Sequence, residues 1–174
     1  MKKGLGVAAV CAVLLIGGGA WFASRGFSAR EKPGPIESFL AGRARDLATP
    51  AAARKLQNPV VATELAVAEG RDHFADHCAV CHANNGSGNT EMGRNMYPPA
   101  PDMRSGRTQE LTDGEIFHII REGVRFTGMP GWGGDDEDNW KLVVFIRRLP
   151  KLSEKELELM KEINGQGPEQ SHTP

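Results

Sequence analysis

The segment Cys78–His82 constrains this chain more than any other feature, because it reads Cys-x-x-Cys-His. Two thiols at this spacing, followed directly by an imidazole, can attach and ligate one haem: Cys78 and Cys81 form thioether bonds with its vinyl groups, and His82 binds the iron. A zinc site usually needs four protein ligands, and the only other cysteine, Cys11, lies far away in an apolar stretch. A thioredoxin-like dithiol needs a βαβ setting, which no strand pattern supports here. The motif therefore predicts one covalent haem c.

Length and composition favour a small helical domain. The 174 residues suffice for one compact domain with additional segments. The chain has 21 Lys and Arg against 22 Asp and Glu, so its overall charge does not indicate nucleic acid as a partner. Its 21 Gly and 11 Pro, with few aromatic residues, favour short helices joined by long loops over a sheet protein. We expect an all-α fold that wraps around a cofactor.

The N-terminus predicts contact with a membrane. The run Leu5–Phe22 carries no charge and as a helix would span about 27 Å, near the thickness of the bilayer's hydrocarbon core. Residues 1–22 are therefore interpreted as a signal-anchor or transmembrane segment. Trp21 and the following Arg25 are typical of a retained interfacial anchor. The small residues Gly18–Ala20 support the alternative, a cleaved signal peptide that leaves a soluble protein.

Three further segments follow along the chain. Residues 23–63 predict a tether, because four prolines interrupt its two short helical stretches. Residues 64–150 carry the haem-attachment motif and the apolar periodicity of a folded domain. Residues 151–174 begin with a capping box, Ser153-x-x-Glu156, which predicts a helix over Glu154–Ile163 and then a disordered polar tail.

The folded segment shows helical signals of its own. From Thr63 onward the apolar spacing is helical and leads into the attachment motif. A capping box that starts at Thr112 predicts a short helix ending at Gly123. The acidic run 135–138 complements the positive end of a helix dipole, which predicts a following helix over Asn139–Leu149.

The second axial ligand of the iron decides whether the haem transfers electrons or binds small molecules. A thioether is a soft ligand that raises the reduction potential, so a positioned methionine is the candidate. Met129 is favoured, because the neighbouring Gly128 and Pro130 fix an extended loop that can present its side chain to the iron. His118 is an alternative ligand. The remaining candidates downstream of His82 are Met92, Met96, Met103 and Met160.

These residues resemble a known family. The Cys-x-x-Cys-His segment 78–82, the loop Gly128–Trp132 and the apolar run Trp140–Ile146 before Pro150 are similar to the mono-haem class I c-type cytochromes. The resemblance covers about residues 64–150 and identifies them as a cytochrome c domain. It implies a small class I cytochrome c fold, with crossing N- and C-terminal helices around one covalent haem, in addition to the N-terminal membrane helix. It also implies haem binding by the site residues Cys78, Cys81, His82 and Met129, the last two as metal ligands.

The resemblance further implies particular contacts. Gly70 and Phe74 match the residues of the first helix that meet Leu142 and Phe145 at the crossing. A glycine suits this place, because the absent side chain lets two backbones approach.

Other implied contacts concern the haem environment. In the family a proline carbonyl orients the proximal imidazole, here expected from Pro98 or Pro99. Outside the closely matching motifs, three residues are candidate partners of the haem propionates, although an ordinary surface or loop role is favoured for each: Arg94, Tyr97 and Arg104.

The function that these features predict is electron transfer without enzymatic chemistry. The haem would cycle between Fe(III) and Fe(II), passing electrons between a dehydrogenase or respiratory complex and an acceptor. The family attaches haem outside the bacterial cytoplasmic membrane, so the haem domain is expected to face the periplasm. One alternative is a fixed haem c subunit of a membrane-bound dehydrogenase complex. Another is a gas sensor or peroxidase with five-coordinate haem.

Overall fold

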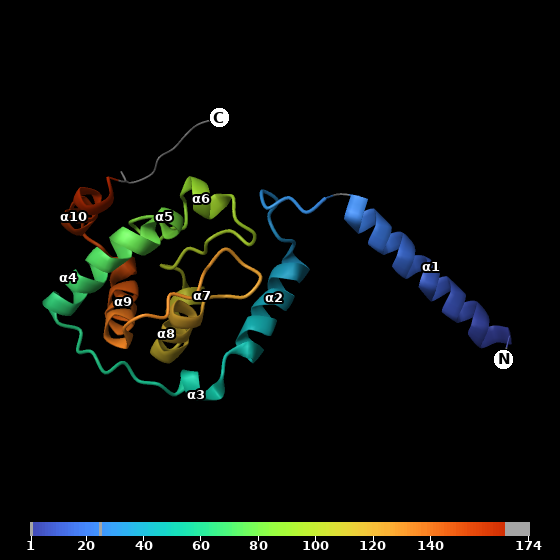
Figure 1. Cartoon of the computed structure of the whole chain (residues 1–174), viewed down its shortest axis with the longest axis horizontal. Coiled ribbons are helices and arrows are strands. Elements are labelled where there is room, and N and C mark those ends of the chain that lie inside the picture. Colours follow the sequence, from blue (N-terminus) through green and yellow to red (C-terminus); the bar gives the residue numbers. More distant parts are fainter. Residues whose placement is uncertain (1, 25, 166–174) are drawn as a thin grey trace.

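The computed structural model describes residues 2–24 and 26–165, and within these ranges every regular element is a helix (Figure 1). The expected all-α fold is confirmed for this part of the chain. The polar tail predicted at the C-terminus lies outside the described residues from position 166 onward. The elements are α1 (Lys2–Ser24), α2 (Pro35–Ala48), α3 (Ala51–Arg54), α4 (Glu64–His73), a π-helical turn (Phe74–Cys78), α5 (Ala79–His82), α6 (Glu91–Arg94), α7 (Gly106–Gln109), α8 (Asp113–Glu122), α9 (Asp136–Arg148), a 3-10 turn (Leu149–Lys151) and α10 (Glu154–Asn164).

Helices α4 and α9 cross at the centre of the domain. A side chain at Gly70 would collide with the backbone carbonyl of Lys141 and would place its Cβ 3.1 Å from that of Phe145. The rings of Phe74 and Phe145 lie 5.2 Å apart, and both side chains are completely buried together with Leu142. Close backbone approach at a glycine, sealed by aromatic packing, confirms the predicted crossing.

Both predicted capping boxes are confirmed. At the start of α8 the Thr112 hydroxyl accepts the Glu115 backbone N–H at 3.2 Å, and the Glu115 carboxylate accepts the Thr112 backbone N–H at 2.8 Å. Ser153 and Glu156 repeat this exchange at the start of α10. Each box satisfies backbone donors that a helix start leaves without partners.

Three features differ from the sequence prediction. Helix α9 begins at Asp136 and not at Asn139, because Asp135 takes the N-cap position and accepts the backbone N–H of Glu137 at 2.7 Å. The acidic run therefore forms the first turn of the helix, where its charges complement the dipole. The short helices α6 and α7 were not predicted, since neither is long enough to show apolar periodicity.

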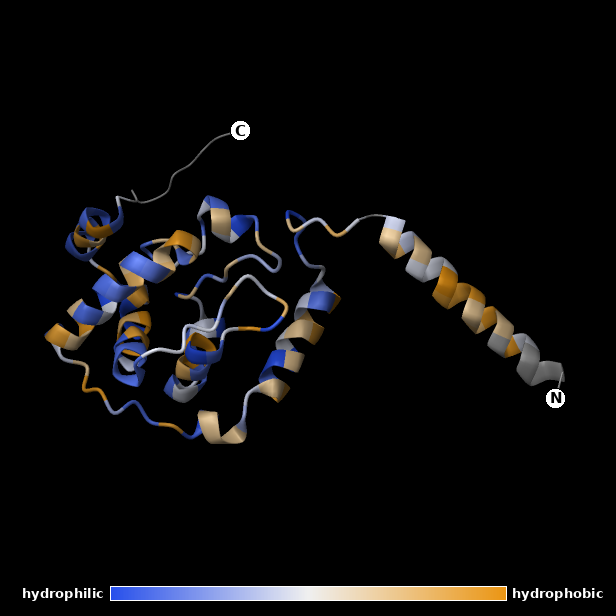
Figure 2. Cartoon of the chain, in the orientation of Figure 1, coloured by the Kyte–Doolittle hydropathy of each residue, from blue (hydrophilic) through white to orange (hydrophobic). Residues whose placement is uncertain are grey.

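Helix α1 stands apart from the rest of the chain, and the part of it that Figure 2 colours is largely apolar (Figures 1 and 2). In the part of the chain that the structure describes, no helix meets the length and apolarity needed to cross a membrane. The membrane-spanning segment expected at residues 1–22 stays a prediction.

Residues 35–54, which fall within the predicted tether, form α2 and α3 and lie against the domain; we call them the N-terminal arm. Helix α3 approaches α8 closely, because a side chain at Gly114 would collide with the backbone carbonyl of Ala53. The Tyr97 hydroxyl donates a hydrogen bond to the Glu37 carboxylate on α2. This bond is the main reason that the pKa of Tyr97 is raised to about 12. The arm therefore touches the domain at both of its ends.

Candidate haem site

The attachment motif lies where helix α4 passes through a π-helical turn into α5. The backbone N–H of Ala79 donates to the carbonyl of Phe74, five residues earlier, as a π turn requires. Cys78 ends this turn, while Cys81 and His82 lie on α5. The three residues that would hold a haem thus share one short, continuous helical segment, in agreement with the expected position of the motif at a helix end.

Both thiols of the motif are free. Burial, reinforced by the neighbouring Cys81, raises the pKa of Cys78 to about 12. Burial also raises the pKa of Cys81. At neutral pH both residues are therefore neutral S–H groups, which is the composition that adds across a vinyl double bond to give a thioether.

His82 is buried, with 8 % of its surface exposed, and burial lowers its pKa. The backbone carbonyl of Pro101 acts in the opposite direction and more weakly. The neutral imidazole is the form that ligates a metal. Nδ1 is buried without a hydrogen-bond partner among the described residues, and the backbone carbonyl of Pro101 lies close to the imidazole. The proline beside the imidazole is therefore Pro101, and the expectation of Pro98 or Pro99 was wrong.

The segment between the motif and α7 folds back onto the motif. A side chain at Gly93 would collide with the Cys81 carbonyl, which also accepts the Thr90 hydroxyl at 3.2 Å. Further along, the backbone N–H of Met103 donates to the carbonyl of Gly86 at 2.8 Å. These contacts explain how a proline distant in sequence comes to lie beside the proximal histidine.

The loop that carries Met129, residues 124–134, is anchored on the C-terminal end of α8. The Met129 carbonyl accepts the Val124 N–H at 3.1 Å, and the Met129 N–H donates to the Thr127 hydroxyl at 3.2 Å. The Trp132 N–H donates to the Ile120 carbonyl on α8 at 3.1 Å. Hydrogen bonds on both sides of Met129 therefore fix the backbone position from which its side chain extends.

Two contacts bring this loop beside the attachment motif. The Trp132 ring meets the His77 ring edge-to-face at 5.5 Å, and His77 directly precedes the first cysteine of the motif. A side chain at Gly128 would collide with the sulfur of Met96, which belongs to the segment folded over the motif. Met129, between these two contact points, is half-buried. The structure thus places the predicted ligand loop next to the attachment motif, while ligation by Met129 stays a prediction.

The other methionines have different surroundings. Met160 is completely buried and Met103 nearly so, and both belong to the hydrophobic core. Met92 is half exposed on α6. Met96 is half-buried against the Met129 loop, which makes it the nearest competitor for the same ligand position.

The residues considered for the haem propionates all have protein partners. Arg104 makes a two-point pair with Asp102, with N–O distances of 2.9 and 2.8 Å. Arg94 donates to the Asn89 side-chain oxygen. Tyr97 is bonded to the N-terminal arm, as described above.

His73 and His77 form a neighbouring pair on the helix before the motif, with ring centroids 4.9 Å apart. Burial, followed by the nearby His77, lowers the pKa of His73. Among the described residues there is no group of three or more His, Cys, Asp or Glu side chains arranged to hold a metal ion.

The residues around the motif fit a haem. Two neutral thiols can form the thioether bonds, and a buried imidazole can offer a nitrogen to the iron. Large apolar side chains of the motif and its neighbouring loops remain exposed, most of all Phe126 at 93 %, and a flat apolar macrocycle is the kind of group that covers such surfaces. These exposed side chains are Val80, Met92, Phe126 and Trp132.

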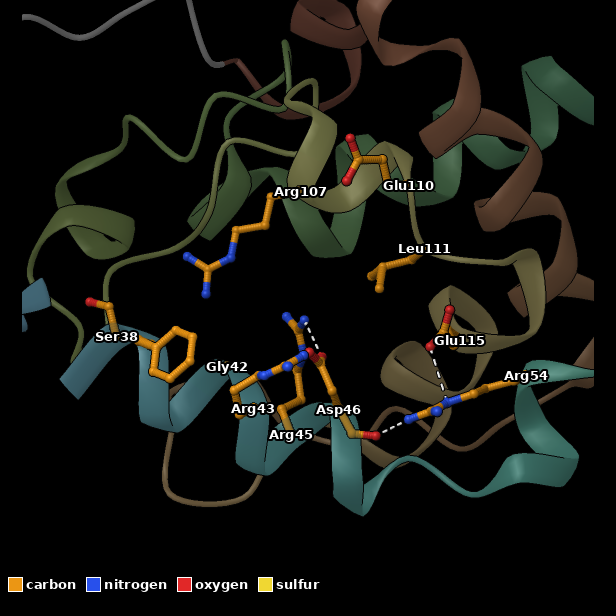
Figure 3. A pocket seen from close by; sticks show the side chains of 11 residues that line it. Ser38, Gly42, Arg43, Arg45, Asp46, Arg54, Arg107, Glu110, Leu111 and Glu115 are labelled. Carbon is orange, nitrogen blue, oxygen red and sulfur yellow. Dashed lines mark hydrogen bonds and ion pairs between the residues drawn. The ribbon is translucent and has the colours of Figure 1, made fainter. Parts of the chain in front are cut away.

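A separate cavity of about 650 Å³ lies under the N-terminal arm, between α2, α7 and α8 (Figure 3). None of the four predicted haem-binding residues lines it. Arg107 on α7 points across the cavity toward the arginines of α2 (Figure 3). The cavity lies between the arm and the domain and is not the haem site. Its charged lining comprises Arg43, Arg45, Asp46, Arg54, Arg107, Glu110 and Glu115.

The crossing of α4 and α9, the Cys-x-x-Cys-His helix end and the neighbouring methionine loop together define a c-type cytochrome domain. Residues 65–146 match the family described as cytochrome C oxidase, cbb3-type, subunit III. The chain therefore carries a mono-haem class I c-type cytochrome domain, which binds covalent haem c for electron transfer. Cys78 and Cys81 are positioned for its attachment. No curated protein matches the chain.

Proposed function

We propose that the chain is an electron carrier whose single haem c is ligated by His82 and Met129. The observation that carries this proposal is the pair of contacts, Trp132 on His77 and Gly128 on Met96, that hold the Met129 loop beside the attachment motif. The bound haem supplies a one-electron Fe(III)/Fe(II) couple. The partners on either side would be a dehydrogenase or respiratory complex and an electron acceptor.

The protein's own residues hold and tune this couple. Cys78 and Cys81 fix the position of the group through covalent bonds, and buried His82 offers a neutral nitrogen. The Met129 thioether would close the opposite axial position, favour the reduced state and exclude water. Since no substrate bond is made or broken, the proposed role is not enzymatic.

Replacing Met129 tests the ligand assignment. Met129→Ala should lower the reduction potential and open the iron to carbon monoxide, while Leu65→Ala, at an exposed position near the start of α4, should leave both properties unchanged. A potentiometric titration and the spectrum of the reduced protein with carbon monoxide measure the two effects. If Met96→Ala alone produces them, Met96 is the ligand. If wild-type protein already binds carbon monoxide, a five-coordinate haem replaces the proposal.

We also propose that the haem domain faces the periplasm and that residues 1–22 tether it to the cytoplasmic membrane. The support is the uncharged run Leu5–Phe22 and the position of α1 apart from the domain. Fractionation of cells that make the full chain should recover the haem in the membrane pellet after a high-salt wash. Deleting residues 2–22 and substituting a cleavable export signal should move it to the soluble periplasmic fraction. A mature protein whose mass lacks the N-terminal segment would instead establish cleavage.

A second candidate is a permanent haem subunit of a membrane-bound enzyme complex. It is favoured by the match of residues 65–146 to a family described as an oxidase subunit. Purification in mild detergent separates the two cases. A haem protein that migrates alone supports the carrier, whereas a constant ratio to other polypeptides supports the subunit.

A further inference from the structure

Asn164, the last residue of α10, contacts both flanks of the haem-attachment motif. Its side-chain amide donates to the backbone carbonyl of Ala75 at 2.8 Å and to the side-chain oxygen of Asn84 at 2.6 Å. The Asn84 amide returns a longer bond to the Asn164 oxygen at 3.3 Å. Ala75 precedes Cys78 and Asn84 follows His82, so a single side chain bridges the two ends of the segment that holds the haem.

The bridge reaches the helix where its geometry is least regular. Ala75 lies in the π turn, whose extra residue per turn departs from the ordinary helical ladder. The regular backbone hydrogen bonds of a helix define this π turn less firmly. The bond from the Asn164 side chain to the Ala75 carbonyl therefore helps to fix its geometry. Both partners are shielded from water, since Ala75 is 1 % and Asn84 4 % exposed. Hydrogen bonds at buried groups are costly to lose.

Core packing and hydrogen bonds fix the position of helix α10, which carries Asn164. Met160 is completely buried in the same core as the crossing helices. The Arg148 guanidinium at the end of α9 donates to the Glu156 carboxylate at 3.0 Å, and Ser153 caps the helix start. The whole helix lies beyond residue 146, where the family match ends. The contact is therefore an addition to the matched domain.

We propose that α10 is a clasp on the haem-attachment segment and that Asn164 is a positioning residue for the proximal ligand. The backbone leaves His82 through Ala83, which has a positive φ of 61°. Holding Asn84 fixes this turn, and the turn sets the direction from which the imidazole approaches the iron. Orientation of an axial ligand by its surroundings tunes a haem potential. This inference rests on the proposed ligation by His82.

The test uses the full-length holoprotein. Asn164→Leu keeps the branching of the side chain but removes its donors, and Glu162→Ala, at an exposed position on the same helix, is the matched control. Asn164→Leu should shift the reduction potential and accelerate the binding of cyanide to the ferric iron several-fold. Glu162→Ala should match the wild type in both measurements. Asn84→Ala, which spares the bond to Ala75, should give a smaller shift of the same sign.

A purely structural role would give a different result. If Asn164→Leu lowers the thermal midpoint but keeps the wild-type potential and cyanide rate, the positioning role is wrong. Should Asn164→Leu not accumulate as holoprotein, Asn164→Asp and Asn84→Ala decide by the same two measurements, because an ionised carboxylate keeps the shape without the donors. Failure of the proposed function is recognised separately, since the wild type itself would then bind carbon monoxide or lack a histidine-ligated haem spectrum.

Discussion

The N-terminal arm and the clasp α10 both lie outside the matched cytochrome segment, yet they attach to it in different ways. The clasp buries Met160 completely and donates hydrogen bonds to shielded groups of the domain. The arm leaves most apolar side chains of α2 in solvent and has a cavity of about 650 Å³ beneath it. Its polar contacts with the domain include an ion pair, Arg54 to Glu115 at 3.3 Å, and the Tyr97 bond to Glu37.

This difference indicates that the burial of apolar side chains stabilises an added segment more than its number of hydrogen bonds and ion pairs does. Burying a large apolar side chain contributes about 1.5–3 kcal/mol. An exposed ion pair contributes about 0–1 kcal/mol. The clasp should therefore unfold together with the domain, while the arm should open locally at a lower free energy.

The largest effect is expected at the centre of the clasp. Met160→Ala should lower the free energy of unfolding by about 2–5 kcal/mol, because it leaves a cavity in a fully buried site. Ile163→Ala on the same helix, where 42 % of the side chain is exposed, should cost much less. Urea unfolding of the holoproteins measures both changes. Equal effects would contradict the distinction between buried and exposed faces of α10.

A smaller, pH-dependent effect is expected from Glu156. Burial raises its pKa, but hydrogen bonds from Ser153 and Arg148 outweigh burial and leave the pKa at about 2. Since this folded-state value lies below that of the unfolded chain, the stabilisation is complete above about pH 4.5 and is lost as the pH falls toward 2. Glu156→Gln should lower the free energy of unfolding by about 1 kcal/mol at pH 7. The difference in stability between this variant and the wild type should disappear in acid. A gap independent of pH would argue against the carboxylate as its cause.

On the arm, Arg54→Ala should cost about 0.5 kcal/mol or less in global stability, because solvent reaches 42 % of the Arg54 side chain and weakens its ion pair with Glu115. The effect should shrink further at high salt, where such pairs are screened. Denaturation at low and high ionic strength provides the comparison. A loss above about 2 kcal/mol would make the arm an integral part of the domain and would remove the contrast with the clasp.

The smallest global effect is expected for Tyr97→Phe, which removes only the hydroxyl that bonds to Glu37. The midpoint of unfolding should not change measurably. Limited proteolysis should nevertheless cut α2 faster in this variant, because one end of the arm is released. Unchanged cleavage would show that the hydroxyl does not hold the arm in solution.

Many features of the fold that depend on residues close together in the sequence were predictable. Capping boxes at Thr112 and Ser153 depend on residues three apart, and the attachment motif is contiguous. The crossing at Gly70 was predictable because a glycine and an aromatic residue four apart mark a close helix contact in the family. Met129 was singled out by its glycine and proline neighbours, and the structure confirms the position of its loop beside the motif, although not the bond to iron.

Features that depend on contacts between distant segments were not predictable in this way. Pro101 lies beside His82 because glycines and a hydroxyl fold the intervening segment back, a path that the family resemblance, which pointed to Pro98 or Pro99, did not specify. Asn164 carried no signal, since an asparagine near the end of a polar helix is ordinary. One available hint was Met160, a large apolar residue in a charged helix, which requires a buried partner surface.

The position of Asn164 in the chain also determines when its bridge can form. Helix α10 follows α4 and the π turn, which it contacts, so the bridge cannot close until the chain through residue 164 is present. Until that residue is present, the π turn around Ala75 and the chain after His82 are not linked through this side chain.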